Sequence, residues 1–362
     1  MKSPSSMKAQ DLVSATTLPP ILALMSRVLR RMWLFATMLL VLGGPVLAQV
    51  APPSDLIPIR IAWIPGSPYR LPVAAAKDLF RKHGLDAEMI RFTSGPAMNA
   101  AYKSGAVDIS VSGPPGVLTI MSTGVRLKVF LLENETADSN GLIVQPDSGI
   151  HSIADLKGKS VAMPQGTVVW VAFFRALKKH GIDLKDVKVL DMGVVPAVAA
   201  FKARQVPAAW VWSQAMYELV DSGGKEIARD RDFGSGPNFW VGRADWVNKN
   251  PEAIQRFFRA MQEAELFYKD DPVEATKLYA KQFNISESIA TRMLTQTKTF
   301  GFQEQLALSG PSLLASKTNG AESILADFAR TLNANGFLRT IPDLTNVVDS
   351  SHVERFLKRS PK

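Results

Sequence analysis

The sequence predicts an α/β protein that is divided into two lobes of similar plan. Three features indicate this fold class. Short apolar strands alternate with helices that end at glycine. A run of helix, glycine, strand, helix and strand recurs about 97–100 residues further along. Two segments are placed to carry the chain from one lobe to the other and back, and 362 residues are enough for two medium-sized cores.

In the first lobe, strands and helices alternate, and glycine closes the helices because it enters the left-handed conformation at a helix end without strain. The predicted elements are strands over residues 59–64, 87–92, 107–111 and 127–132, and helices over residues 73–83, 97–103 and 116–123. Gly84 and Gly105 end the first two helices. This order is a βα plan, which places helices against a mostly parallel sheet.

Two glycine-containing turns follow strands of this lobe. Ser94 and Gly95 open a helix, with Ser94 as its cap and Pro96 in its first turn. Ser112 and Gly113 end the next strand. Open α/β sheets bind ligands at the carboxyl ends of their strands, and unpaired N–H groups at helix starts favour anions. A single turn of this kind is more often an ordinary connection, so the ligand interpretation depends on the second lobe.

The second lobe repeats this plan and supplies facing turns. The matching segments, in order, are Lys82-His83-Gly84 with Lys179-His180-Gly181, Pro96-Ala97 with Pro196-Ala197, and residues 100–103 with 199–202. The alternative is chance similarity between helix ends, but the shared order and the nearly constant spacing argue against it. Gln165, Gly166 and Thr167 open a helix that starts with Val168 and Val169. This helix start is the predicted counterpart of the first-lobe turns.

An aromatic residue ends a strand of the second lobe. Trp210 and Trp212 are two apart and therefore share one face of their strand. Trp212 is nearer the loop, and we predict that it forms a wall of the ligand site.

The crossings define the predicted domain boundaries. A strand over residues 141–145 is expected to lead into the second lobe, and residues 234–238 lead back. The predicted division is a leader over residues 1–48, lobe one over residues 49–143 and 237–362, and lobe two over residues 144–236. From residue 251 onward apolar residues recur at helical spacing, which predicts a helical extension that covers lobe one.

The first 48 residues have the organisation of a cleavable export signal. Arg27, Arg30 and Arg31 precede an apolar run that ends in Val46-Leu47-Ala48, a small-residue cleavage site. The alternative is a membrane anchor, but the run is about 16 residues long, short of the ~20 that a spanning helix needs. We therefore expect a protein that is exported to the periplasm by a cleavable signal peptide.

Charge and composition exclude several classes of partner and chemistry. The net charge of +9 falls to +5 without the leader, which leaves 37 basic and 32 acidic residues, and no basic stripe with interleaved aromatic residues occurs. Nucleic acid is therefore not an expected partner.

The chain contains no cysteine, which excludes disulfides, thiolate metal sites and cysteine nucleophiles. Its four histidines have no triad or metal spacing, so no enzyme activity, cofactor or metal is predicted.

Several segments, in their order along the chain, carry a family resemblance. They read IRIAW, SGAVDISVSG, VFLLENE, DLKGKSVAMPQGT, PAVAAFKARQVPAAWVWSQA and FWVGRADWVNKNPEAI. The chain resembles the periplasmic substrate-binding proteins of ABC importers in the nitrate, sulfonate and taurine group, and taurine-binding proteins most of all. The resemblance covers roughly residues 57–270. It implies a two-lobed (type II-like) periplasmic binding protein with its ligand cleft between the lobes.

The resemblance also implies a binding site and partners. Ser94 and Gly95 match the first-lobe helix start of the family, and Thr167, Val168 and Val169 match the second-lobe helix start that holds the anionic head. Trp212 matches an aromatic wall. The implied ligand is a small organic anion, delivered to an inner-membrane ABC permease by a protein that we expect to be a monomer.

Three departures from the family pattern make the implied cleft less polar. Asn238 stands where taurine binders carry an aspartate for the ligand amine, Pro114-Pro115 replace a pair of serines, and Ile64 replaces a glutamine. The resemblance therefore implies a more apolar or larger anion than taurine. A nearby acid, Glu133, Glu135 or Asp138, is a substitute partner for an amine, although at least two of the three are expected in a solvated loop.

Two alternative functions remain open at this stage. The first is a sensor that presents its ligand to a membrane receptor, because import and sensing use the same fold. The second is a protein of the related thiamine-pyrimidine branch, as a binder or an enzyme. No lysine pattern for its pyridoxal phosphate chemistry is present, which disfavours the second alternative.

Overall fold

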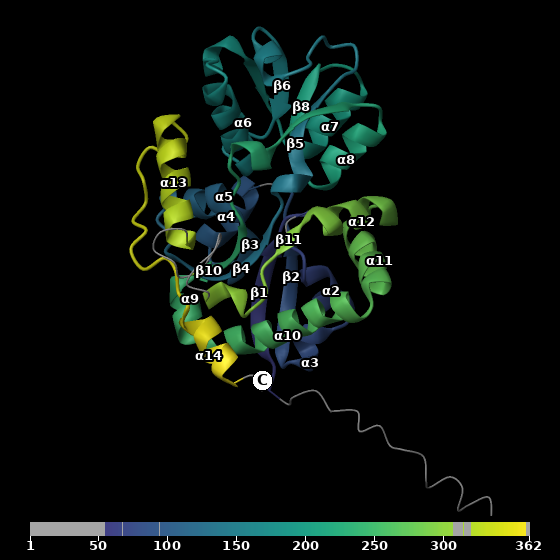
Figure 1. The fold of residues 1–362 in the computed structure, drawn as a ribbon. Coiled ribbons are helices and arrows are strands. Elements are labelled where there is room, and N and C mark those ends of the chain that lie inside the picture. The colour runs from purple at the N-terminus through teal and green to yellow at the C-terminus, as the bar shows by residue number, and fades with distance from the viewer. Residues whose placement is uncertain (1–54, 67, 94, 307–313, 315–319, 360–362) are drawn as a thin grey trace, which may run out of the picture. The chain divides into compact units, whose positions relative to one another are not determined.

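The computed structural model of the protein describes residues 55–66, 68–93, 95–306, 314 and 320–359 (Figure 1). The predicted signal peptide over residues 1–48 lies outside the described residues. No helix in the described part of the chain has the length and apolar character needed to cross a membrane.

The described strands form two separate sheets. The first sheet has the strand order β11-β4-β10-β3-β1-β2 and the second the order β7-β6-β8-β5-β9. The strands of the first sheet are β1 (Ile57–Trp63), β2 (Leu85–Arg91), β3 (Ile109–Ser112), β4 (Leu127–Glu135), β10 (Asn238–Arg243) and β11 (Lys298–Thr299). Those of the second are β5 (Asn140–Val144), β6 (Ser160–Met163), β7 (Lys188–Asp191), β8 (Ala208–Trp212) and β9 (Lys225–Arg229). We call the parts of the chain built on these sheets lobe one and lobe two.

The predicted repeat is present as an equivalent strand order. In lobe one, β2, β1 and β3 are parallel neighbours. Strand β10 then pairs antiparallel with β3, and β4 pairs antiparallel with β10. In lobe two, β7, β6 and β8 are parallel neighbours. Strand β5 pairs antiparallel with β8, and β9 pairs antiparallel with β5. The two crossing strands, β5 and β10, therefore occupy the same position in their sheets. Lobe two begins with β5 at Asn140, a few residues before the predicted boundary at residue 144.

Helices cover both sheets. Those of the first part of the chain are α2 (Leu71–Ala76), α3 (Leu79–Lys82), α4 (Gly95–Lys103) and α5 (Pro114–Ser122). Lobe two carries α6 (Val168–Lys179), α7 (Val194–Lys202) and α8 (Gln214–Asp221). The rest are α9 (Ala244–Lys249), α10 (Pro251–Asp270), α11 (Pro272–Phe283), α12 (Glu287–Gln296), α13 (Ala321–Ala334) and α14 (Ser351–Arg359). Short 3-10 turns occur at η1 (Ala137–Ser139), η2 (Ile153–Leu156), η3 (Leu184–Asp186), η4 (Asp230–Phe233) and η5 (Glu304–Leu306).

The C-terminal helices pack on lobe one, as predicted. Helix α10 contacts α2 and α3, α11 contacts α2, and α14 contacts α10. In α10, Ile254, Phe257, Phe258 and Met261 are fully buried, which is the helical spacing that the sequence shows. Two of these helices also contact lobe two, since α12 packs on α8 and α13 approaches α6 (Figure 1).

Two helices begin or end differently from the prediction. The helix expected over residues 73–83 is divided into α2 and α3, because Asp78 takes a left-handed backbone conformation with φ 52°. Helix α5 begins at Pro114, two residues before the predicted start at Gly116. Proline suits the first turn of a helix, where its missing N–H would have no intrahelical partner.

Candidate functional site

The predicted turns of the two lobes meet at Gly113 and Val168. Gly113 precedes the first turn of α5, and a methyl group added to it would lie 3.1 Å from Val168 Cγ1 and 3.5 Å from Asn238 Oδ1. These residues come from three elements: the start of α5, the start of α6 and the first residue of β10. The structure therefore brings three of the predicted site residues together.

On the lobe-two side, the amino end of α6 is not capped by a side chain. The residue before the helix is Thr167, whose hydroxyl donates to the carbonyl of Pro164 at 2.7 Å instead of accepting from the helix. The first N–H groups of a helix have no intrahelical partner, so those of Val168 and Val169 remain available to an acceptor. The turn itself is fixed from the other side, since the Gln165 N–H donates to the Asp191 carboxylate at 3.0 Å.

On the lobe-one side, the polar side chains beside Gly113 are neutral. Asn238 is 9% exposed, and its amide N–H₂ donates to the Asn134 side-chain oxygen at 2.9 Å. Ser112 is buried, and its hydroxyl donates to the carbonyl of Gly113 within its own turn. A ligand at this place would therefore meet amides and apolar atoms, since the three described atoms nearest to a methyl group on Gly113 belong to Val168, Asn238 and Pro115.

Of the three acids considered as partners for a ligand amine, Glu133 already binds other groups of the protein through both carboxylate oxygens. It is completely buried and forms an ion pair of 2.8 Å with Arg70, which is also completely buried. Its other oxygen accepts from the N–H groups of Tyr69 and Arg70. The indole of Trp240 donates to the ion-paired oxygen at 2.8 Å. This network holds the loop between β1 and α2 against the end of β4.

The other two acids differ in exposure. Asp138 forms an ion pair of 2.5 Å with Arg231 at the surface. Glu135 is half-buried at the end of β4, where it pairs in the sheet with Lys298. Burial raises the pKa of Glu135, and the nearby charge of Lys298 opposes that shift. Glu135 is thus the acid of this group that is not bound in an ion pair among the described residues.

A second contact between the lobes lies beside Trp212. Trp212 is half-buried at the end of β8, and Ser213 follows it with φ 52°. The Ser213 hydroxyl donates to the Gly66 carbonyl of lobe one at 3.0 Å. The side-chain oxygen of Gln214 is buried there without a hydrogen-bond partner among the described residues. Sequence reasoning missed Gly66 and Ser213, because the positive φ of Ser213 has no composition signal.

Two predicted site residues of the first lobe, Ser94 and Gly95, have no described contact with Gly113 or Val168. Ser94 lies outside the described residues. Gly95 begins α4, and a methyl group added to it would have no described atom within 4 Å. Trp170, in the first turn of α6, is 1% exposed and packs on Phe174 and Phe337.

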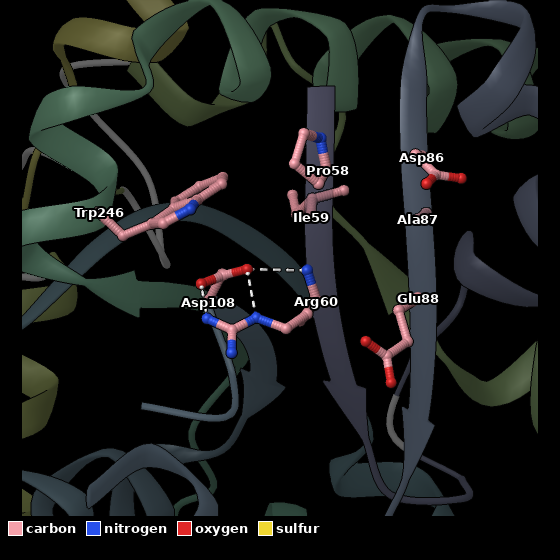
Figure 2. Close-up of a pocket in the computed structure, with 8 residues that line it drawn as sticks. All are labelled: Pro58, Ile59, Arg60, Asp86, Ala87, Glu88, Asp108 and Trp246. Atoms are coloured by element: carbon pink, nitrogen blue, oxygen red, sulfur yellow. Dashed lines mark hydrogen bonds and ion pairs between the residues drawn. The ribbon is translucent and has the colours of Figure 1, made fainter. Parts of the chain in front are cut away.

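A pocket of about 400 Å³ lies elsewhere, at the amino ends of β1 and β2 (Figure 2). Its lining residues are Pro58, Ile59, Arg60, Asp86, Ala87, Glu88, Asp108 and Trp246. Arg60, its main donor, is bound to both oxygens of Asp108 at 3.0 and 2.6 Å. Ligands of open α/β sheets bind at the opposite, carboxyl ends of the strands. This pocket is therefore not the candidate site. Among the described residues, no group of three or more His, Asp or Glu side chains is placed to hold a metal ion.

Two α/β lobes of equivalent strand order, joined by two crossing strands and in contact through the turns at their strand ends, define a two-lobed binding-protein fold. The chain belongs to the NMT1/THI5-like family, whose pattern matches residues 69–275. A protein of Brucella abortus described as a binding protein is 30% identical over 285 residues, covering 76% of this chain and 88% of the relative. The taurine-binding periplasmic protein of Escherichia coli is 29% identical, covering 55% of this chain and 63% of its own.

Solved structures share the fold at lower identity. The alkanesulfonate-binding protein SsuA from Xanthomonas axonopodis pv. citri, bound to MOPS, has a TM-score of 0.69 and 19% identity, covering 82% of this chain and 99% of its own. The desulfurization enzyme DszB has a TM-score of 0.62 and 16% identity, covering 84% of this chain and 99% of its own. Relatives of this chain are thus binding proteins, while the fold also occurs in an enzyme.

Proposed function

We propose that the protein is the periplasmic solute-binding component of an ABC transporter, which captures a small organic anion of the sulfonate or taurine-like class and delivers it to a membrane permease. The observation that carries the proposal is the uncapped amino end of α6, whose Val168 faces Gly113 of the other lobe. Free N–H groups and the positive end of the helix dipole favour a sulfonate head at this place. The sulfonate and taurine binders among its relatives support the same ligand class.

The neutral environment favours an anion without an ammonium group. Asn238 and Asn134 bind each other, and Glu133 is neutralised by Arg70. An ammonium group at Asn238 would lose its water without gaining a carboxylate partner, which costs free energy. We therefore infer that alkanesulfonates bind more tightly than taurine.

We propose binding without catalysis. The chain has no cysteine, so no thiol is available as a nucleophile. The residues that converge at the lobe contact are a glycine, a valine and an asparagine, and none of them is a general base at neutral pH. Conversion of an added sulfonate by the purified protein, followed by mass spectrometry, would refute this part of the proposal.

A thermal-shift screen tests the ligand class. The panel contains ethanesulfonate, MOPS, taurine, nitrate, acetate and a thiamine-type pyrimidine. A ligand at 100 times its Kd should raise the free energy of unfolding by about 2.7 kcal/mol, which is a readily measured shift of the melting temperature. Stabilisation by the pyrimidine alone would replace the sulfonate assignment with the thiamine-related alternative.

Trp212→Ala is expected to weaken ethanesulfonate binding at least tenfold, about 1.4 kcal/mol, by removing an aromatic wall. Isothermal titration calorimetry measures the change. Trp246→Ala is the matched control, because Trp246 is also half-buried but lines the pocket at the amino ends of the strands. Equal affinity of the two variants would remove Trp212 from the site.

Asn238→Asp is expected to raise the taurine-to-ethanesulfonate affinity ratio about tenfold, because it places a carboxylate beside Gly113 where an ammonium group could bind. Asn248→Asp makes the same change of net charge at an exposed position of α9 and should leave the ratio unchanged. A ratio that moves equally in both variants would show that only the overall charge matters.

A further inference from the structure

We propose that Phe337 and Asp327, in the C-terminal segment, position the amino end of α6 and control how readily the two lobes separate. Their segment, residues 321–338, comprises α13 and the turn that follows it, and we call it the C-terminal strap. The consequence for ligand release rests on the proposed function, whereas the effect on lobe separation does not.

Phe337 contacts the amino end of α6 at two residues, Trp170 and Gly166. Its ring centroid lies 4.2 Å from that of Trp170, in the first turn of the helix. A methyl group added to Gly166 would lie 3.2 Å from Phe337 Cδ1, so the ring also rests on the turn before the helix. Gly166 has φ +70°, which a residue with a side chain rarely adopts. A side chain at Gly166 would therefore strain the backbone and also crowd the Phe337 ring.

Two helical turns further along α6, Arg175 makes a second attachment to the strap. Its guanidinium forms an ion pair with Asp327 in the middle of α13. It also donates to the Gly234 carbonyl at 2.8 Å and lies 4.9 Å from the ring centroid of Phe328. Arg175 therefore joins lobe two both to the strap and to the segment through which the chain returns to lobe one.

The return crossing is enclosed by lobe one at the same place. A methyl group added to Gly236 would lie 2.7 Å from Pro114 and 3.0 Å from Phe328. Pro114 begins α5, and α13 packs along α5 (Figure 1). The strap is thus anchored on lobe one through α5 and reaches lobe two through Phe337, Asp327 and Phe328.

These contacts connect the strap to the proposed anion site. Val168 and Val169 lie in the chain between Gly166 and Trp170, the two residues that Phe337 contacts, and Val168 faces Gly113 of lobe one. Lobe two cannot move away from Gly113 without either carrying Phe337 along or breaking its contacts with Trp170 and Gly166. Asp327 is about half exposed, so water and salt screen its ion pair, and Phe337 should dominate the effect.

The test measures lobe separation without any ligand. Because the chain has no cysteine, Lys103→Cys in lobe one and Lys185→Cys in lobe two give two specific nitroxide sites, both exposed. Double electron–electron resonance then reports the distance distribution between them. Phe337→Ala should lengthen and broaden this distribution, Asp327→Asn should change it less, and Phe337→Tyr should restore it. Ile341→Ala is the matched control, since Ile341 is an apolar residue of similar exposure that lies just beyond the strap.

A Phe337→Ala distribution identical to that of the parent protein would overturn the proposal. If that variant fails to fold, Phe337→Leu, which keeps apolar bulk without the ring, decides in its place. In a second arm, the dissociation rate of ethanesulfonate from the Phe337→Ala protein should rise about tenfold, with Ile341→Ala unchanged. Failure of ethanesulfonate to bind the parent protein would contradict the proposed ligand class, while the distance measurement would still decide the role of the strap.

Discussion

Replacing Arg70 by methionine should lower the free energy of unfolding by about 3–5 kcal/mol, because it leaves the Glu133 carboxylate buried without its cation. Both side chains are completely buried, and Arg70 also binds Glu265 at 2.9 Å and the Phe300 carbonyl at 2.5 Å. The change therefore releases the loop after β1, the end of β4, α10 and the segment before η5 at once. Urea denaturation followed by circular dichroism measures the loss.

Arg81→Met is the control for this experiment. Arg81 also forms ion pairs, with Asp78 and Asp86, but its side chain is 51% exposed. Exposed pairs of this kind contribute about 0–1 kcal/mol. A loss for Arg70→Met as small as that for Arg81→Met would show that the buried network adds nothing to stability.

Replacing Asp230 by asparagine should remove a decline in stability between pH 4 and pH 7. Burial raises the pKa of Asp230 to about 7, although Trp210 and Asn140 donate hydrogen bonds to it at 2.7 and 3.0 Å. Asp230 directly follows β9, which occupies the position in its sheet that β4, the strand of Glu133, occupies in the other. The described residues offer Asp230 no cation comparable to Arg70. The folded state therefore favours the protonated form of Asp230.

The sign of the pH dependence follows from this raised pKa. The stability contributed by protonated Asp230 is fully present below pH 4 and is lost as the pH rises to about 7. The loss amounts to about 4 kcal/mol at pH 8, since each pKa unit corresponds to 1.36 kcal/mol. In Asp230→Asn, the introduced oxygen keeps the Trp210 donor. The introduced N–H₂ group can donate to the side-chain oxygen of Asn140 once the Asn140 amide turns over, and that oxygen is buried without a partner among the described residues. The variant should thus be more stable than the parent protein at pH 8 and similar at pH 4.

Thermal unfolding across this pH range is the measurement. The control is Asp183→Asn, at a side chain that is 71% exposed in the same lobe. A parallel stability profile for Asp230→Asn and the parent protein would mean that Asp230 does not titrate in this range. Asp183→Asn makes the same chemical change at an exposed position and controls for the loss of one negative charge.

Much of the fold was predictable because its signals are local. Glycine stops, strand-length apolar runs and helical spacing depend on neighbouring residues, and the structure confirms the two-lobed α/β class and the C-terminal helical cover. The failures are local as well. Asp78 divides a helix by adopting a backbone conformation that its sequence neighbours do not require. Pro114 starts a helix where the glycine two residues later was expected to do so.

The candidate site was predictable only in part. Gly113, Val168 and Asn238 were expected together and do converge. Glu133 was considered as a ligand group and is instead bound to Arg70, which lies 63 residues away in the chain. Sequence spacing carries no information about such a pair, because the two residues meet only when the loop after β1 packs on the end of β4. Phe337 escaped prediction for the same reason.

The sequence by itself determined the two lobes, their repeated plan and the turns that bear the candidate anion site, since these follow from short-range patterns of apolar residues, glycine and proline. Only the tertiary structure decided which polar groups remain available at those turns. Burial and pairing decided it. Glu133 forms an ion pair with Arg70, the Ser112 hydroxyl donates to the Gly113 carbonyl, and the Gln165 N–H donates to Asp191. The first turn of α6, in contrast, has no side-chain cap. Phe337, far along the chain, packs on Trp170 of that turn because it directly follows α13, which lies beside α6.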